Sequence, residues 1–195
     1  MPRTESNAIV LGAAAPDFVL PDATGQLFRL DDFAGRPALL VAFVSNRCPF
    51  VLLIREALAR FGRDYATRGV AVVAVNSNDA GSFPEESLAR LGEAARAFGF
   101  GFPYLKDADQ AVAKRYGAAC TPDLFLYDGD RRLAYHGQFD GARPGNGMPT
   151  TGADLRAAVD AVLAGERPSH VQQPSVGCNI KWLPGNAPSW FRVAA

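Results

Sequence analysis

The sequence predicts an α/β fold in which helices flank one central mixed sheet. Two continuous apolar runs, residues 38–44 and 69–75, have the composition of strands that are buried on both faces. A segment with helical character follows each run, and two short strands around Asp128-Gly129-Asp130 form a late antiparallel hairpin. This order indicates parallel strands first and an antiparallel pair at one edge of the sheet.

The segment before the first buried run is predicted to be a β-hairpin. Residues 15–20 and 26–30 are short apolar runs, and the turn between them contains Asp22 and Gly25. Residues 31–35 are expected to form a turn or a short helix that leads into the buried strand.

The remaining elements follow from periodicity and capping signals. Residues 51–61 have a wide apolar helical face, and Ser82-Phe83-Pro84-Glu85 offers a capping box for a helix that reaches about Phe98. Residues 102–105 predict a short strand and residues 109–116 a short helix. The late hairpin comprises residues 123–127 and 132–136, and the last helix covers residues 154–163.

The length of 195 residues suits one domain with extensions. We expect an N-terminal tail at residues 1–10, the folded domain at 11–164 and a C-terminal extension at 165–195. The extension carries Trp182 and Trp190, which a disordered tail rarely has. It is therefore expected to pack back on the domain, or on the partner subunit of a homodimer.

Composition excludes several classes of partner. The chain has 20 Lys and Arg against 20 Asp and Glu and no basic run, so neither nucleic acid nor an anionic membrane is expected as a partner. No secretory signal and no membrane-length apolar run is present, which predicts a cytoplasmic protein. Three cysteines cannot all pair within one chain, so they are redox-active or inert buried thiols.

Cys48 is the strongest candidate for chemistry. It lies between the first buried strand and the start of a helix. Unpaired backbone N–H groups and the positive end of the helix dipole favour the thiolate there, and the thiolate is the nucleophile. Arg47 adds a positive charge if its side chain folds back over the sulfur.

A second candidate feature is Cys120-Thr121-Pro122. Pro122 stands at the mouth of a predicted strand, where it cannot donate a hydrogen bond to the sheet. Such a proline is typical of a special turn, with a cis peptide bond as one form.

These elements and several short motifs resemble the thioredoxin fold, in its alkyl hydroperoxide reductase / thiol-specific antioxidant (redoxin) branch. The closest resemblance is to the peroxiredoxin-like subgroup of thioredoxin-family proteins, and it covers nearly the whole chain. The motifs that carry it are Ala15-Pro16-Asp17-Phe18, Cys48-Pro49-Phe50-Val51, Asn76-Ser77-Asn78-Asp79, Cys120-Thr121-Pro122-Asp123, Arg143-Pro144-Gly145-Asn146-Gly147 and Pro174-Ser175-Val176-Gly177-Cys178.

The resemblance implies a thiol-dependent oxidoreductase with Cys48 as the nucleophile. Its substrate would be a peroxide or a protein disulfide, and its reductant a thioredoxin-like protein or a low-molecular-weight thiol, in an antioxidant role. No cofactor is implied. The phosphate-loop and dinucleotide patterns are absent, and the two histidines, His136 and His170, have no metal-ligand spacing to the cysteines.

The chain departs from the subgroup around Cys48. Ser45 stands where the subgroup has a second cysteine, so Cys48 has no adjacent thiol with which to form a disulfide. Ser45 instead resembles the peroxiredoxin threonine whose hydroxyl hydrogen-bonds the thiolate. Val41 replaces the peroxiredoxin proline, and Arg47 and Arg143 are the candidates for a supporting arginine.

The other two cysteines each have a functional and a structural interpretation. In the thioredoxin fold, the residue before the proline faces the active cysteine, so the backbone of Thr121 could pair with an extended substrate. Cys120 would then lie near the rim of the site and either resolve an oxidised Cys48 or stay inert in a strand. Cys178 either folds back as the resolving thiol or packs as an apolar residue. The alternative to an enzyme is a redox-inactive or redox-sensing binding protein of the same fold.

Overall fold

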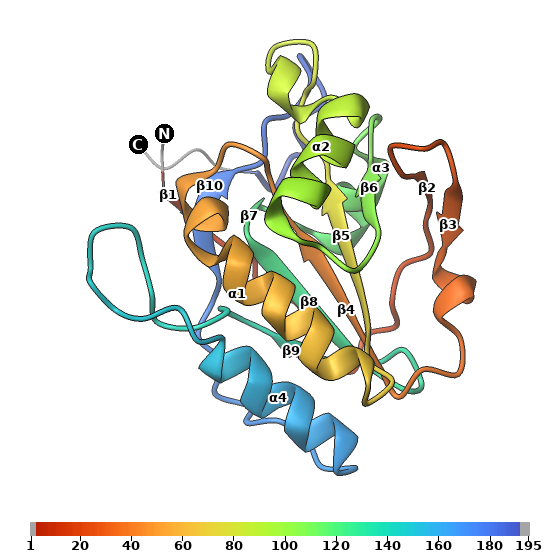
Figure 1. Cartoon of the computed structure of the whole chain (residues 1–195), viewed down its shortest axis with the longest axis vertical. Coiled ribbons are helices and arrows are strands. Elements are labelled where there is room, and N and C mark those ends of the chain that lie inside the picture. The colour runs from red at the N-terminus through yellow and green to blue at the C-terminus, as the bar shows by residue number, and fades with distance from the viewer. Residues whose placement is uncertain (1–2, 192–195) are drawn as a thin grey trace.

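The computed structural model describes residues 3–191, and a five-stranded mixed sheet forms its centre (Figure 1). The strands lie in the order β6-β5-β4-β8-β9, with β4 parallel to β5, β5 parallel to β6, and β8 antiparallel to both β4 and β9. Their bounds are β4 Ala38–Phe43, β5 Ala71–Asn76, β6 Tyr104–Lys106, β8 Asp123–Asp128 and β9 Leu133–His136. The predicted mixed α/β sheet and its late hairpin are confirmed.

Helices cover both faces of this sheet because its central strands are apolar on both sides. Leu40 and Ala42 of β4 face α1, α2 and α4, whereas Leu39 and Val41 face α3 and the β2–β3 hairpin. The helices are α1 Pro49–Ala66, α2 Leu88–Phe98, α3 Ala111–Tyr116 and α4 Ala153–Leu163. The hairpin comprises β2 Val19–Pro21 and β3 Leu27–Arg29, and the 3₁₀ helix η1 Leu30–Phe33 follows it.

The start of α2 differs from the prediction. Residues 84–86 form a separate 3₁₀ helix, η2 Pro84–Glu86, and α2 begins only after Ser87. Ser82 therefore does not cap α2. Pro84 stands in the first turn of η2, where its missing N–H costs nothing.

A second, three-stranded sheet joins the two ends of the chain beside the start of α1. Its order is β1-β10-β7, with β1 Arg3–Glu5, β10 Val176–Asn179 and β7 Cys120–Thr121, all antiparallel. Thus the segment expected to be an N-terminal tail contributes β1, and the C-terminal extension contributes β10. Figure 1 shows β10 next to the first turn of α1.

Candidate functional site

Cys48 is the N-cap residue of α1, directly before Pro49. Its carbonyl accepts the first helical hydrogen bond, from the N–H of Leu52 at 2.9 Å. The 18-residue helix that follows directs its positive end toward the thiol. The cysteine is only 1% exposed, so this charge acts in a setting with little solvent screening.

The Cys48 side chain meets two residues of the three-stranded sheet. The sulfur lies 3.0 Å from the carbonyl oxygen of Thr121, to which the protonated form of Cys48 donates a hydrogen bond. Thr121 pairs in register with Cys178 of β10, which brings the Cys178 thiol within hydrogen-bonding reach of Cys48. The structure therefore brings a second thiol to Cys48 from a strand 130 residues away in sequence.

These neighbours favour the thiolate of Cys48. A hydrogen bond from the Cys178 thiol is the largest influence, and the Thr121 hydroxyl and the N–H groups of Val51 and Cys178 add to it. Burial opposes them, yet the pKa of Cys48 falls from its ordinary 9.0 to about 6. Within residues 3–191 the buried Thr121 hydroxyl makes no hydrogen bond, so nothing competes with the Cys48 sulfur for its proton.

The pKa of Cys178 moves in the opposite direction. Its hydrogen bond to Cys48 is the main cause of a strongly raised pKa, and burial and the negative charge of the Cys48 thiolate act in the same sense. Lys181, three residues further along the chain, lowers it. The two opposite pKa shifts favour the charge on Cys48 and the proton on Cys178.

Ser45 does not hold the thiolate in the way that the peroxiredoxin threonine suggested. Its hydroxyl donates to Oε1 of Glu86 at 2.5 Å, and its oxygen accepts the backbone N–H groups of Cys48 at 3.2 Å and Arg47 at 3.3 Å. Because a hydroxyl has one proton, none remains for the sulfur. Ser45 instead fixes the backbone of the loop that presents Cys48.

Glu86 is the residue of this site that the sequence analysis did not assign. It is fully buried, and each carboxylate oxygen accepts two hydrogen bonds. The donors are the Ser45 hydroxyl, the Asn46 N–H and the side-chain amides of Asn76 and Asn78. Glu86 thereby joins the loop before Cys48 to the end of β5.

Lys106 and Tyr104 complete this polar network on β6. The Lys106 ammonium donates to Oδ1 of Asn76 at 2.9 Å and to the Asn78 carbonyl at 2.5 Å. Burial lowers the pKa of Lys106 to about 8, against the opposing influence of the Glu86 carboxylate. The Tyr104 hydroxyl donates to Oδ1 of Asn46 at 3.0 Å. The loop that carries the nucleophile is thus connected to β5 through Glu86 and Asn76, and to β6 through Tyr104.

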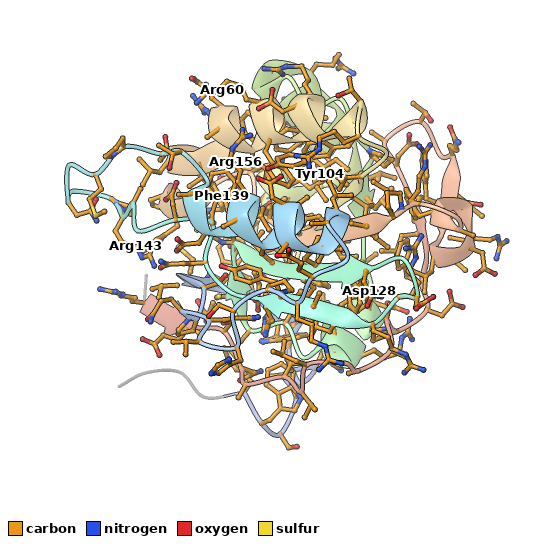
Figure 2. All side chains as sticks on the ribbon, turned by 90° about the horizontal axis from the view of Figure 1, so that it is seen from below. Arg60, Tyr104, Asp128, Phe139, Arg143 and Arg156 are labelled. Carbon is orange, nitrogen blue, oxygen red and sulfur yellow. The ribbon has the colours of Figure 1, made fainter. Side chains whose placement is uncertain are left out.

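Both candidate arginines, Arg47 and Arg143, bind other groups than the Cys48 sulfur. The guanidinium of Arg47 lies over the Phe83 ring, 4.5 Å from its centroid. Arg143 donates to the carbonyls of Asp140 and Ala142 at 2.7 Å each and to the side chain of Gln138. Figure 2 places Arg143 in the loop that projects from the body of the molecule. The hydrogen-bond donors that stabilise the Cys48 thiolate are neutral groups, namely the Cys178 thiol, the Thr121 hydroxyl and backbone N–H groups.

Cys120 lies one residue before Thr121 on β7 and pairs in register with Asn179 instead of Cys178. Its sulfur contacts the Pro122 carbonyl at 3.5 Å and the Ser175 carbonyl at 4.0 Å. Complete burial, followed by the nearby Asp123 carboxylate, raises the pKa of Cys120. The structure gives Cys48 a different thiol neighbour, Cys178, and keeps Cys120 protonated.

The peptide bond between Thr121 and Pro122 is cis, as the special turn at this position suggested. The backbone of Thr121, however, does not face solvent. It is paired with Cys178 of β10, so the edge that we expected to receive an extended substrate is occupied by the chain itself.

No metal centre accompanies these thiols within the described residues 3–191, where no group of three or more metal-ligating side chains gathers. His136 bonds Oδ1 of Asp123 at 2.8 Å and stacks on Phe125, which accounts for its burial.

Two solved structures share this architecture. A hypothetical protein from Sinorhizobium meliloti 1021 is 69% identical, with a TM-score of 0.91 over 92% of this chain and 98% of that one. The thioredoxin domain of a thiol-disulfide oxidoreductase from Bacteroides vulgatus is 17% identical, with a TM-score of 0.57 over 66% of this chain and 89% of that one. The second shows that the fold is thioredoxin-like.

Curated relatives agree with the redox chemistry of the site. The thiol-disulfide oxidoreductase ResA of Geobacillus thermodenitrificans is 31% identical over 125 residues, which cover 64% of this chain and 67% of that protein. A Mycobacterium tuberculosis protein named "Putative peroxiredoxin" is 29% identical over 119 residues, 59% of this chain and 68% of its own length. The model of the AhpC/TSA family matches residues 11–136, a span that contains β2 to β9 and Cys48. The chain belongs to the AhpC/TSA family.

Proposed function

We propose that the protein is a thiol-dependent oxidoreductase in which Cys48 attacks the oxidant and Cys178 resolves the product. The observation that carries this proposal is the pairing of a Cys48 thiol of pKa about 6 with a protonated Cys178 thiol on the register partner of Thr121. A thiolate and a thiol in contact are the two reactants that an intramolecular disulfide requires.

With a hydroperoxide as substrate, the Cys48 thiolate attacks one peroxide oxygen and breaks the O–O bond. Cys48 becomes a sulfenic acid, and the leaving alkoxide or hydroxide takes a proton to give an alcohol or water. Cys178 then loses its proton and attacks the Cys48 sulfur, which forms the disulfide and releases water. An external dithiol reduces that disulfide and is itself oxidised.

Electrostatics set the order of these steps. Before oxidation, the Cys48 thiolate raises the pKa of Cys178 through a hydrogen bond and through its charge. Conversion of Cys48 to a neutral sulfenic acid removes both influences, while Lys181 continues to lower the Cys178 pKa. Cys178 therefore becomes a competent nucleophile only after Cys48 has reacted.

The burial of Cys48 favours a small peroxide over a protein disulfide as the oxidant. A depression lined by the neighbouring residues Phe50 and Pro122, though not by Cys48 itself, has a volume of about 10 Å3, close to the space of one water molecule. An antioxidant role and a cytoplasmic location stay predictions. Among the helices of residues 3–191, none combines the length and the hydropathy of a membrane-spanning segment.

Peptide mapping by mass spectrometry after one equivalent of hydrogen peroxide tests the proposal. We expect a Cys48–Cys178 disulfide in the wild type and in Cys120→Ser, and a sulfenic or more oxidised Cys48 in Cys178→Ser. Cys48→Ser should consume no peroxide. A Cys48–Cys120 disulfide would contradict this proposal, because Cys120 and not Cys178 would then be the resolving thiol. An unmodified Cys48 would favour the redox-inactive binding protein.

A further inference from the structure

The strand β10 is paired with the β7 edge that contains Thr121 as a regular strand of the sheet. It lies between β1 and β7, so both of its hydrogen-bonding edges are used. On one side Cys178 pairs with Thr121, and on the other it pairs with Arg3. Strand addition of this kind is how extended polypeptides bind to a free sheet edge.

Gly177 allows β10 to lie directly against the cis peptide. A Cβ atom on Gly177 would stand 1.9 Å from the Thr121 carbonyl oxygen and 2.5 Å from its carbon. It would also stand 3.1 Å from the Pro122 nitrogen. The φ angle of Gly177 lies outside the left-handed region, so the close approach alone requires glycine here.

Anchors on both sides hold the strand in this place. Before it, the Ser175 hydroxyl donates to the Gly137 carbonyl at 2.7 Å. After it, Ile180 donates to the Ala119 carbonyl at 3.1 Å and is 1% exposed. Lys181 then exchanges backbone bonds of 2.8 Å with the Asn78 side chain and the Asp79 N–H. These contacts leave Thr121 only 2% exposed.

From this geometry we propose that β10 is an internal occupant of the polypeptide-binding edge beside Cys48. While β10 is seated, polypeptide disulfides are excluded from the thiolate and small oxidants react with it. Detachment of β10 frees the Thr121 edge for another extended chain. A segment that replaces it as closely must also place a glycine against the Thr121–Pro122 peptide. This inference rests on the proposed role of Cys48.

The test compares a large and a small oxidant in single turnover. All proteins carry Cys178→Ser, so that Cys48 cannot form the internal disulfide. With insulin, the Cys48 thiolate attacks a disulfide sulfur, forms a mixed disulfide and releases an insulin thiolate, which a non-reducing gel detects. With hydrogen peroxide, the product is a Cys48 sulfenic acid, measured by mass spectrometry. The ratio of the two rates cancels any change in the thiolate fraction.

Gly177→Ala is the opening variant, because its methyl group fits only if β10 moves away from Thr121. The ratio of insulin rate to peroxide rate should rise about tenfold or more, as an overpacked strand shifts toward its detached state. Amide hydrogen exchange should increase at residues 176–180. Gly101→Ala is the matched control, since a Cβ there meets nothing within 4 Å, and its ratio should equal that of the parent.

Ser175→Ala provides an independent route, because it removes one anchor without adding an atom. Its ratio should lie between those of the parent and Gly177→Ala. An unchanged ratio in a variant whose β10 exchanges faster, or rapid insulin capture by the parent itself, overturns the occupant role. Failure of the peroxide reaction in every protein would instead contradict the proposed function.

Discussion

The substitution Cys178→Ala tests whether a thiol on another strand makes Cys48 acidic. It removes the donor with the largest influence on a pKa that lies about three units below the ordinary 9.0. Three units correspond to about 4 kcal/mol of preference for the thiolate. Loss of the largest contributor should raise the pKa by at least about one unit, or about 1.4 kcal/mol.

At pH 7 this change lowers the thiolate fraction of Cys48 from about 90% to about 50% or less, as a one-unit shift requires. The assay is the pH dependence of iodoacetamide alkylation, followed on the Cys48 peptide so that the other cysteines do not contribute. Cys178→Ser is the matched control. Its hydroxyl can still donate to the thiolate, so its midpoint should lie closer to that of the wild type.

Coincident profiles for the wild type and Cys178→Ala would refute this account of the acidity. So would identical midpoints for the alanine and serine variants, because the argument depends on a donor at position 178 and not on the presence of a thiol. In the first case the helix dipole and the Thr121 hydroxyl would have to supply the whole effect.

Three further predictions concern the same site. Glu86→Gln places an amide NH2 against donors such as the Ser45 hydroxyl, and should lower the free energy of unfolding by about 2–4 kcal/mol in urea titrations. The control Glu85→Gln, at an exposed position, should change this free energy little. Equal losses in the two variants would contradict the role of Glu86 in the network. The free energy of unfolding of the reduced protein should rise between about pH 6 and 9, by up to about 1.4 kcal/mol per pH unit, because unfolded Cys48 binds a proton that the folded thiolate lacks. This contribution is lost as the pH falls through 6. A Cys48→Ala variant whose stability has the same pH slope would refute the prediction. Cys120→Ala should leave the rate of peroxide-driven disulfide formation within about twofold of wild type, because the Cys120 sulfur contacts backbone carbonyls and not Cys48. A large decrease of this rate, measured by stopped-flow fluorescence, would indicate that Cys120 is a resolving thiol.

The central sheet and the position of Cys48 could be predicted because their signals are local. An uninterrupted apolar run indicates a strand buried on both faces, and the cysteine that follows it stands at a helix start. The cis proline at 122 also has a local signature, a proline at the beginning of a strand. Each of these features is decided by a few consecutive residues.

The partner of Cys48 could not be predicted in the same way. The strand β10 has four residues, Val176–Asn179, with no alternation of apolar and polar side chains, and it pairs with the two-residue strand β7. Its register depends on how closely Gly177 approaches the Thr121–Pro122 peptide, which is a property of the folded chain. The sequence alone therefore leaves both Cys120 and Cys178 open as the resolving thiol.

Glu86 was missed for a different physical reason. A glutamate two residues after a proline at a helix start has the same local pattern whether it compensates the helix dipole in solvent or is buried. Burial of a carboxylate becomes acceptable only when several donors surround it. Its donors come from the loop before Cys48 and from Asn76 and Asn78, and no spacing rule connects those segments.

The replacement of a neighbouring cysteine by Ser45 changes what controls the disulfide. In a C-x-x-C motif, one turn of backbone holds both sulfurs at a fixed separation. Here the separation of the Cys48 and Cys178 sulfurs depends on the position of β10, and hence on Gly177 and on the hydrogen bonds of Ser175 and Ile180 on either side of the strand. Ser45 meanwhile bonds the Cys48 N–H and Glu86, so its position serves the backbone and not the sulfur. The chemistry of Cys48 is thereby coupled to the packing of the C-terminal strand, and a chain that kept Cys48-Pro49 but lost Gly177 would retain the nucleophile without its resolving thiol.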